Sequence, residues 1–209
     1  VVTGVQTCAL PISGGYVVNA SSEQGLLAVN GMSYQARDGE NANSALIVTV
    51  TPKDFPEEGA LGGIAFQRDL EKKAWELGKG KVPVQLFGDF CAHQPSSQLG
   101  EIHPNIKGGY VLTDVRSILP KELGDSIEEG IFAFGKKLSG FDRKDAVLSG
   151  IESRTSSPVR LVRDQKGLSN ITGIYPCGEG AGYAGGITSA AMDGIKTAEW
   201  IASEYMMKL

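Results

Sequence analysis

Short apolar segments separated by polar clusters dominate the first fifty residues. Residues 15–19, 26–30 and 45–50 are largely apolar, and Ser, Glu, Gly, Asp and Asn fill the stretches between them. This pattern is typical of short β-strands joined by polar loops. We therefore expect an antiparallel sheet in this part of the chain.

Two amphipathic helices are predicted further along. The first covers residues 66–78 and is capped by its last glycine, with apolar positions at spacings of four, four and three: Phe66, Leu70, Ala74 and Leu77. Residues 82–90 predict another strand, and 91–113 are mostly loop. The second helix follows Pro120 and ends near Gly140, with one apolar face: Leu123, Ile127, Ile131, Phe134 and Leu138.

The pattern changes near residue 142, which predicts a boundary between a domain of residues 14–141 and one of residues 142–209. Apolar runs at 147–152 and 171–175 predict two more strands. A final helix follows, and we expect it to pack on a sheet through an inner face of mostly small side chains: Ile187, Ala190, Ala191, Gly194, Ala198 and Ala202.

The connection into this last helix carries the candidate chemistry. A predicted strand leads into Gly178-Glu179-Gly180, and Gly185-Gly186 precede the helix. Glycine lets a backbone approach a ligand closely, a carboxylate accepts hydrogen bonds from sugar hydroxyls, and a helix N-terminus favours phosphate or an anionic ring edge. A tight turn is the alternative for any single glycine cluster. The order strand, acid, double glycine and small-faced helix favours a ligand site.

Composition removes several classes of partner. The net charge is −4 and the pI about 5.3, and no run of Lys or Arg reaches five residues, which argues against nucleic acid. The apolar runs are far shorter than the roughly 20 residues of a membrane helix. Cys8, Cys91 and Cys177 share no zinc-like spacing, and with only His93 and His103 available we expect no metal site. Reduced thiols in a cytoplasmic protein are the expectation.

The first residues have a separate explanation. Residues 2–12 match a translated sequencing-adapter oligonucleotide residue for residue. A natural strand or signal peptide is the alternative, but the segment has neither a basic region nor a sustained apolar core. We expect residues 1–13 to be a foreign leader, which would make this chain the C-terminal fragment of a longer protein.

Four stretches carry a resemblance to a known family: "SGGYVVNASSEQG", "NGMSYQARDGENANSAL", "ESRTSSPVRLVRD" and "YPCGEGAGYAGGITSAAMDGI". They resemble the C-terminal half of the bacterial predicted FAD-dependent dehydrogenases, relatives of the two-domain flavoprotein oxidoreductases. The resemblance covers about residues 14–209. It implies an α+β or α/β fold, in which an antiparallel-sheet substrate domain with helices joins the closing part of a discontinuous Rossmann-like FAD domain. In such a domain a GxGxxG loop after the first strand holds the pyrophosphate; this chain contains no GxGxxG after a strand, and "GEGAGYAGG" does not open a βαβ unit.

The resemblance also implies roles for individual residues. Glu179 resembles the acidic residue that binds hydroxyls on the ribityl or pyrophosphate side of FAD, and the helix start after Gly185 resembles the one set against the flavin. Arg154, Ser156 and Ser157 lie where related proteins bring a loop beside the isoalloxazine, with a surface turn as the alternative. The implied cofactor-binding set is Gly178, Glu179, Gly180, Gly185, Gly186, Ile187, Thr188, Arg154, Ser156 and Ser157.

The remaining polar residues are more ambiguous. Cys177 is either a redox thiol or, as we expect, a buried small residue, and Asp193 reads as a solvent-facing charge. His93 and His103 are expected at the surface. A further polar set near the first strands belongs by resemblance to the region of the catalytic cavity, although loop solubility explains most such residues: Asn19, Ser21, Ser22, Asn30, Ser33, Arg37, Asn41 and Asn43.

The sequence therefore predicts part of an FAD-dependent oxidoreductase that transfers hydride through its flavin. Its expected partners are a small-molecule substrate, NAD(P)H as electron donor or acceptor, and the missing N-terminal half of the same protein. The catalytic residues are not assigned. A non-catalytic flavin- or nucleotide-binding module is the alternative.

Overall fold

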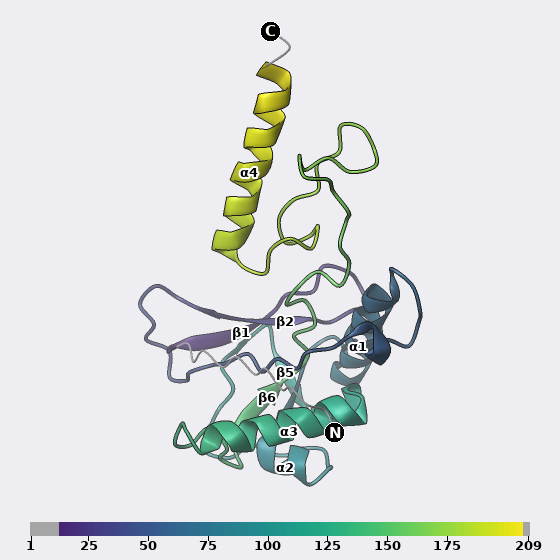
Figure 1. The fold of residues 1–209 in the computed structure, drawn as a ribbon. Coiled ribbons are helices and arrows are strands. Elements are labelled where there is room, and N and C mark those ends of the chain that lie inside the picture. Colours follow the sequence, from purple (N-terminus) through teal and green to yellow (C-terminus); the bar gives the residue numbers. More distant parts are fainter. Residues whose placement is uncertain (1–12, 207–209) are drawn as a thin grey trace. The chain divides into compact units, whose positions relative to one another are not determined.

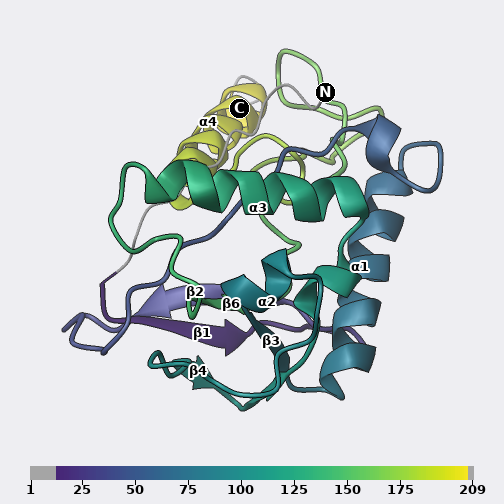
Figure 2. The same cartoon turned by 90° about the horizontal axis from the view of Figure 1, so that it is seen from below.

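Three strands form the first sheet of the protein in a computed structural model, which describes residues 13–206. β1 (Gly15–Asn19) pairs antiparallel with β2 (Val29–Ser33) (Figure 1). β4 (Ile106–Lys107) lies parallel on the other side of β1 (Figure 2). The second strand begins three residues later than predicted. Residues 45–50 form no strand, which corrects that expectation: they are mostly half-buried and take part in no strand pairing.

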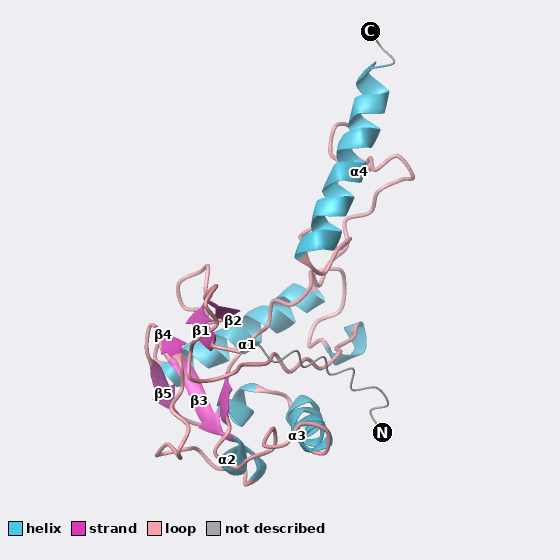
Figure 3. Cartoon of the chain, turned by 90° about the vertical axis from the view of Figure 1, so that its left-hand side faces the viewer, coloured by secondary structure: helices cyan, strands magenta, loops and turns pink. Residues whose placement is uncertain are grey.

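The second sheet is built around one buried strand. β3 (Val82–Leu86) lies between β5 (Tyr110–Leu112), to which it is parallel, and β6 (Val147–Ser149), to which it is antiparallel. Val82 and Val84 are fully buried in it. Both sheets are thus mixed rather than purely antiparallel. Small mixed sheets together with helices confirm the α+β class (Figure 3).

The helices of this part follow the predicted periodicity, with changed ends. α1 (Gly62–Gly78) buries Phe66, Leu70 and Ala74. α3 (Lys121–Gly135) ends five residues early, at a glycine whose added Cβ would lie 2.1 Å from Cγ of Asp142. The predicted strand 82–90 is divided, because its last residues turn into the short helix α2 (Phe87–Cys91) (Figure 2). Both phenylalanines of α2 are buried.

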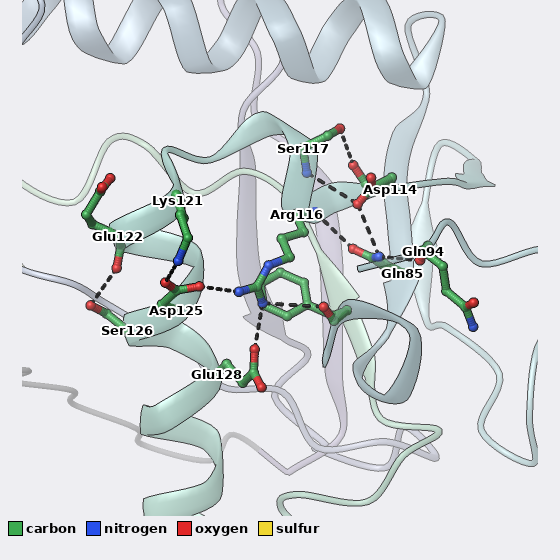
Figure 4. Close-up of polar contacts among 11 residues, drawn as sticks. Gln85, Gln94, Asp114, Arg116, Ser117, Lys121, Glu122, Asp125, Ser126 and Glu128 are labelled. Carbon is green, nitrogen blue, oxygen red and sulfur yellow. Dashed lines mark hydrogen bonds and ion pairs between the residues drawn. The ribbon is translucent and has the colours of Figure 1, made fainter. Parts of the chain in front are cut away.

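A buried arginine joins several of these elements. Arg116 belongs to the 3₁₀ helix η2 (Val115–Ile118), and its guanidinium contacts Asp125 and Glu128 of α3 and the carbonyl of Phe90 in α2 (Figure 4). Its backbone N–H donates to the buried side chain of Gln85 in β3, at 2.9 Å. The guanidinium thus has two carboxylates and a carbonyl as partners, as a buried ion requires.

The chain divides into two compact units. The first contains the described residues up to Asp54 together with Gln67–Ser153, and it includes both sheets, η1 (Pro52–Asp54) and α3. The second contains Phe55–Phe66 and the described residues from Arg154 onward, including α4 (Ile187–Met206). The domain limits expected from the sequence, 14–141 and 142–209, stay a prediction about the whole protein.

The second unit differs most from expectation. Residues 171–175 form turns and loop instead of a strand, and β6 ends at Ser149 instead of continuing to residue 152. α4 forms as predicted, but it packs through another face: Asp193 and Thr197 are buried or nearly so, whereas Ile187 is 93% exposed. In the described part of the chain, no helix is both long and apolar enough to cross a membrane.

Candidate functional site

The glycine segment before α4 is a tight loop. The Tyr183 N–H donates to the Gly178 carbonyl at 3.0 Å, and the Gly182 N–H donates to the Glu179 carbonyl at 2.9 Å. These two bonds close the loop on itself and leave its tip, Glu179 and Gly180, exposed. The predicted carboxylate is therefore presented to solvent at the turn of a hydrogen-bonded loop.

Only two glycines of this loop, Gly178 and Gly182, have a backbone conformation that disfavours other residues. Gly178 and Gly182 have φ values of +73° and +80°, and an added Cβ at Gly182 would lie 2.6 Å from the carbonyl oxygen of Val159. Gly180 has no such φ, and a Cβ there would meet nothing within 4 Å. At Gly185 and Gly186 an added Cβ would make only ordinary contacts, at 3.6 and 3.8 Å.

The fold of this unit thus does not itself require glycine at 180, 185 or 186. These positions present open backbone, which is the property that close approach of a bound cofactor needs. The loop therefore leaves room for a bound cofactor, and flavin binding at these residues stays a prediction.

Two stretches that the sequence predicted separately come together here. The Ser157 hydroxyl lies 2.8 Å from the Val159 carbonyl and 3.2 Å from the Gly180 carbonyl. The Ser156 hydroxyl lies 3.6 Å from where a Cβ of Gly185 would be. Arg154, Ile187 and Thr188 are exposed. The structure thus brings residues 156–157 beside 180 and 185, and their binding of a cofactor stays a prediction.

An ion pair beside this loop was missed by the sequence analysis. The Arg163 guanidinium donates to both carboxylate oxygens of Asp193, at 2.6 and 2.9 Å, and the two side chains are only 9% and 13% exposed. The hydrogen bond from Arg163, aided by one from the Gly178 N–H, lowers the pKa of Asp193 to about 2. The prediction of a solvent-facing Asp193 is wrong, because Arg163 covers it.

One signal in the sequence indicates this face. Asp193, Thr197, Trp200 and Glu204 recur at spacings of four, three and four along α4. Each contacts the preceding loops or is buried: Trp200 lies against Gly167, and Glu204 accepts a 2.8 Å hydrogen bond from the Tyr175 hydroxyl. That bond raises the pKa of Tyr175 to about 12. From the sequence alone, a helix face that carries two acidic residues is expected to face solvent, because their partners Arg163 and Tyr175 cannot be recognised there.

The cysteines and histidines carry no catalytic arrangement in the described residues. Cys177 is exposed, so the expectation of a buried small residue is wrong. Burial and the neighbouring Glu128 carboxylate raise the pKa of Cys91 to about 11, which makes it a poor nucleophile. His93 and His103 are both exposed, as predicted.

Several members of the polar set near β1 have structural roles. The Asn19 side chain accepts hydrogen bonds from the Ser21 N–H and hydroxyl. Asn41 donates to the His103 carbonyl, and Asn43 donates to the Tyr16 carbonyl. These amides therefore hold strands and loops of the first unit, although the Asn43 Oδ1 atom is buried and accepts no hydrogen bond from the described residues.

Comparison with known proteins identifies the class. A family model described as "FAD-dependent protein, C-terminal domain-like" matches residues 8–155, more than half of the 209 residues. The chain therefore belongs to this family of FAD-dependent proteins. The match begins inside the predicted foreign leader, of which residues 1–12 lie outside the described part of the structure, and it ends before the glycine loop.

A second comparison extends over the glycine loop. The chain is 52% identical over 201 residues to a protein of Clostridium beijerinckii (strain ATCC 51743 / NCIMB 8052) described only as "Uncharacterized protein". The alignment covers 95% of this chain and 37% of the relative. It therefore includes most of residues 175–206, and the chain spans little more than a third of the relative's length.

Proposed function

We propose that this chain is the C-terminal part of an FAD-dependent oxidoreductase, and that the loop of residues 178–186 supplies the flavin-end contacts. The observation that carries the proposal is the meeting of residues 156–157 with 180 and 185 at glycines that their own fold does not require. Membership in a family of FAD-dependent proteins supports the identity of the cofactor.

Each part of the loop has a distinct task in this proposal. The exposed Glu179 carboxylate accepts hydrogen bonds from sugar hydroxyls. The first N–H groups of α4 have no acceptor within the helix, so the helix start favours negative charge at the edge of the flavin ring. Gly180, Gly185 and Gly186 let the backbone come close. FAD, when bound, supplies the hydride chemistry, and the protein supplies position and electrostatics.

The other partners follow from the same proposal. The electron donor or acceptor is NAD(P)H, and the substrate is a small molecule. The N-terminal half of the same protein supplies the GxGxxG loop that holds the pyrophosphate. The Clostridium relative is long enough to contain such a half, since this chain covers only 37% of it.

The outer, exposed face of α4 is apolar, which supports its packing against another part of the intact protein. Ile187 is 93% exposed and Ile195 62%, and they form one stripe with exposed small residues: Ala191, Ala198 and Ala202. Small and apolar side chains along one helix face suit close packing on a sheet. We assign this face to the β-sheet of the N-terminal half.

The test is FAD binding by the full-length protein and by residues 14–209 alone. We expect the full-length protein to retain flavin after desalting and NAD(P)H to bleach its visible band, and we expect the shorter chain to retain none, because it lacks most of the pyrophosphate surface. Retention near one-to-one by the shorter chain would show a self-sufficient flavin domain. Flavin that binds but is not reduced under any assay would favour a non-catalytic module.

Glu179→Ala tests the named contact. A lost charged hydrogen bond is typically worth ~1.5–3 kcal/mol, so we expect FAD affinity to fall by at least about tenfold. The matched control is Glu199→Ala, which removes an exposed glutamate that lies on α4 and not in the loop. This variant should leave the affinity for FAD unchanged. Equal affinity in the two variants would exclude Glu179 from the site.

A further inference from the structure

The backbone on either side of Cys177 is held by a single ion pair. Arg163 Nη1 donates to the Pro176 carbonyl at 2.8 Å, and Asp193 Oδ2 accepts from the Gly178 N–H at 2.9 Å. The same Nη1 and Oδ2 bond each other at 2.9 Å. The pair therefore fixes the Pro176 carbonyl and the Gly178 N–H, which flank Cys177.

The far end of the loop is held on the same arginine. The Tyr183 ring lies 3.6 Å from the Arg163 guanidinium carbon, and its hydroxyl donates to the Leu161 carbonyl at 2.9 Å. The Tyr183 N–H closes the loop on the Gly178 carbonyl. Both ends of the exposed tip, Glu179-Gly180, are thus attached to one buried guanidinium.

The chemistry of the Arg163–Asp193 pair suits it to orienting the backbone groups that it binds. A buried ion pair is often no more stabilising than well-packed apolar side chains, but it does fix the orientation of the groups that it binds. Here those groups are the peptides that lead into Glu179, and Gly178 has the left-handed φ of +73°. We expect loss of the pair to free this turn while α4 keeps its other contacts, such as the Tyr175–Glu204 hydrogen bond.

We propose that Arg163 and Asp193 are positioning residues that set the Gly178–Gly180 backbone for the flavin, an inference that rests on the proposed function. Neither residue touches the cofactor. They act through Gly178 and Glu179, and the sequence analysis assigned no role to either of them in the site.

The experiment compares Asp193→Asn with Tyr175→Phe in the full-length protein. Asp193→Asn keeps the size of the side chain and removes the charge that Arg163 binds. Tyr175→Phe removes another bond between these loops and α4, the 2.8 Å bond to Glu204, and leaves the Arg163 pair intact. Circular dichroism tests whether both variants are folded. If Asp193→Asn does not fold, Arg163→Lys takes its place as the variant that disturbs the ion pair.

Two readouts are measured: hydrogen exchange of peptides covering residues 176–183, and the dissociation constant for FAD. We expect Asp193→Asn to speed exchange at Gly178 and to weaken FAD binding about tenfold or more, with a shifted visible flavin band, because one charge-assisted bond and the loop geometry are lost. Tyr175→Phe should change neither readout. Arg163→Lys should resemble Asp193→Asn, since an ammonium lacks the fork that reaches both Asp193 and Pro176.

Failures of the two proposals are distinguishable. If the wild-type protein binds no FAD, the proposed function is wrong, and the positioning role falls with it. If the wild type binds FAD and Asp193→Asn speeds exchange without changing its affinity or spectrum, the pair serves stability alone. Unchanged exchange at Gly178 would equally overturn the positioning role.

Discussion

The Ser153 hydroxyl donates a 2.6 Å hydrogen bond to the Glu71 carboxylate, although 82 positions separate the two residues. Glu71 lies on α1 and is 1% exposed. One turn earlier, the side chain of Gln67 donates to the Ser153 carbonyl at 2.8 Å. Two side chains of α1 thus fix the residue after which the chain leaves the first unit for the Arg154–Ser157 stretch.

Ser153→Ala should destabilise the protein. The substitution removes a donor from a buried carboxylate, and weakening the solvation of such a group typically costs ~1–3 kcal/mol. Urea denaturation measures the change, with the exposed Ser97→Ala as a control that should stay within about 0.5 kcal/mol of wild type. Equal midpoints for the two variants would contradict a contribution from the Glu71 bond.

Gly180→Ala and Gly182→Ala should have opposite consequences. Alanine at 182 is strained by the positive φ and meets the Val159 carbonyl, so we expect a loss of about 1–3 kcal/mol in stability. Alanine at 180 has open space and a permitted backbone, so stability should be unchanged while FAD affinity falls in the full-length protein. Thermal unfolding and FAD titration measure the two effects. Unimpaired FAD binding by Gly180→Ala would remove close approach as the reason for that glycine.

Acid should weaken the second unit through Asp193. Its pKa lies near 2 in the folded protein, below the usual 3.8, because the carboxylate is bound by Arg163. The contribution to stability, on the order of 1–2 kcal/mol, is therefore complete above about pH 5 and is lost progressively as the pH falls from about 5 toward 1. Denaturation curves at pH 7, 4 and 3 measure the difference in stability between wild type and Asp193→Asn, which should narrow slightly at pH 4 and by roughly half at pH 3. A constant gap across this range would be inconsistent with the lowered pKa.

Deleting residues 1–13 should leave the melting temperature unchanged, because we expect that segment to be a foreign leader that adds nothing to stability. Differential scanning calorimetry of the full chain and of residues 14–209 is the measurement. The family match begins at residue 8, so residues 8–13 are the part of the predicted leader that could belong to the family domain. A clear fall in melting temperature would mean that residues within 1–13 belong to the fold.

Ile195→Lys tests the outer face of α4. If the N-terminal half covers this face, a buried lysine there should destabilise the full-length protein by several kcal/mol. The same substitution in the 209-residue chain should raise solubility, since Ile195 is 62% exposed. A full-length protein of unchanged stability would show that this face stays open to solvent.

Local pattern determined most of the elements in this protein. The strand at 15–19, the helix that ends at Gly78 and the helix after Pro120 were predictable, because alternation and 3.6-residue periodicity depend on which side chains must be buried. The glycine-rich turn before α4 was also indicated by the sequence, since left-handed turns such as those at Gly178 and Gly182 favour glycine, whereas its binding of a cofactor stays a prediction. Element ends were not, as Gly135 illustrates: the helix stops where Asp142 packs against it, seven positions further on.

Only the tertiary structure decided which side of α4 is packed and how the loop before it is held. α4 has two possible inner faces, one of small apolar residues and one that begins with Asp193, and periodicity cannot choose between them. The choice was made by Arg163, thirty positions away, whose guanidinium needs a carboxylate once it is buried. Residues 171–175 are apolar enough for a strand, but a strand exists only where another lies beside it to share its hydrogen bonds.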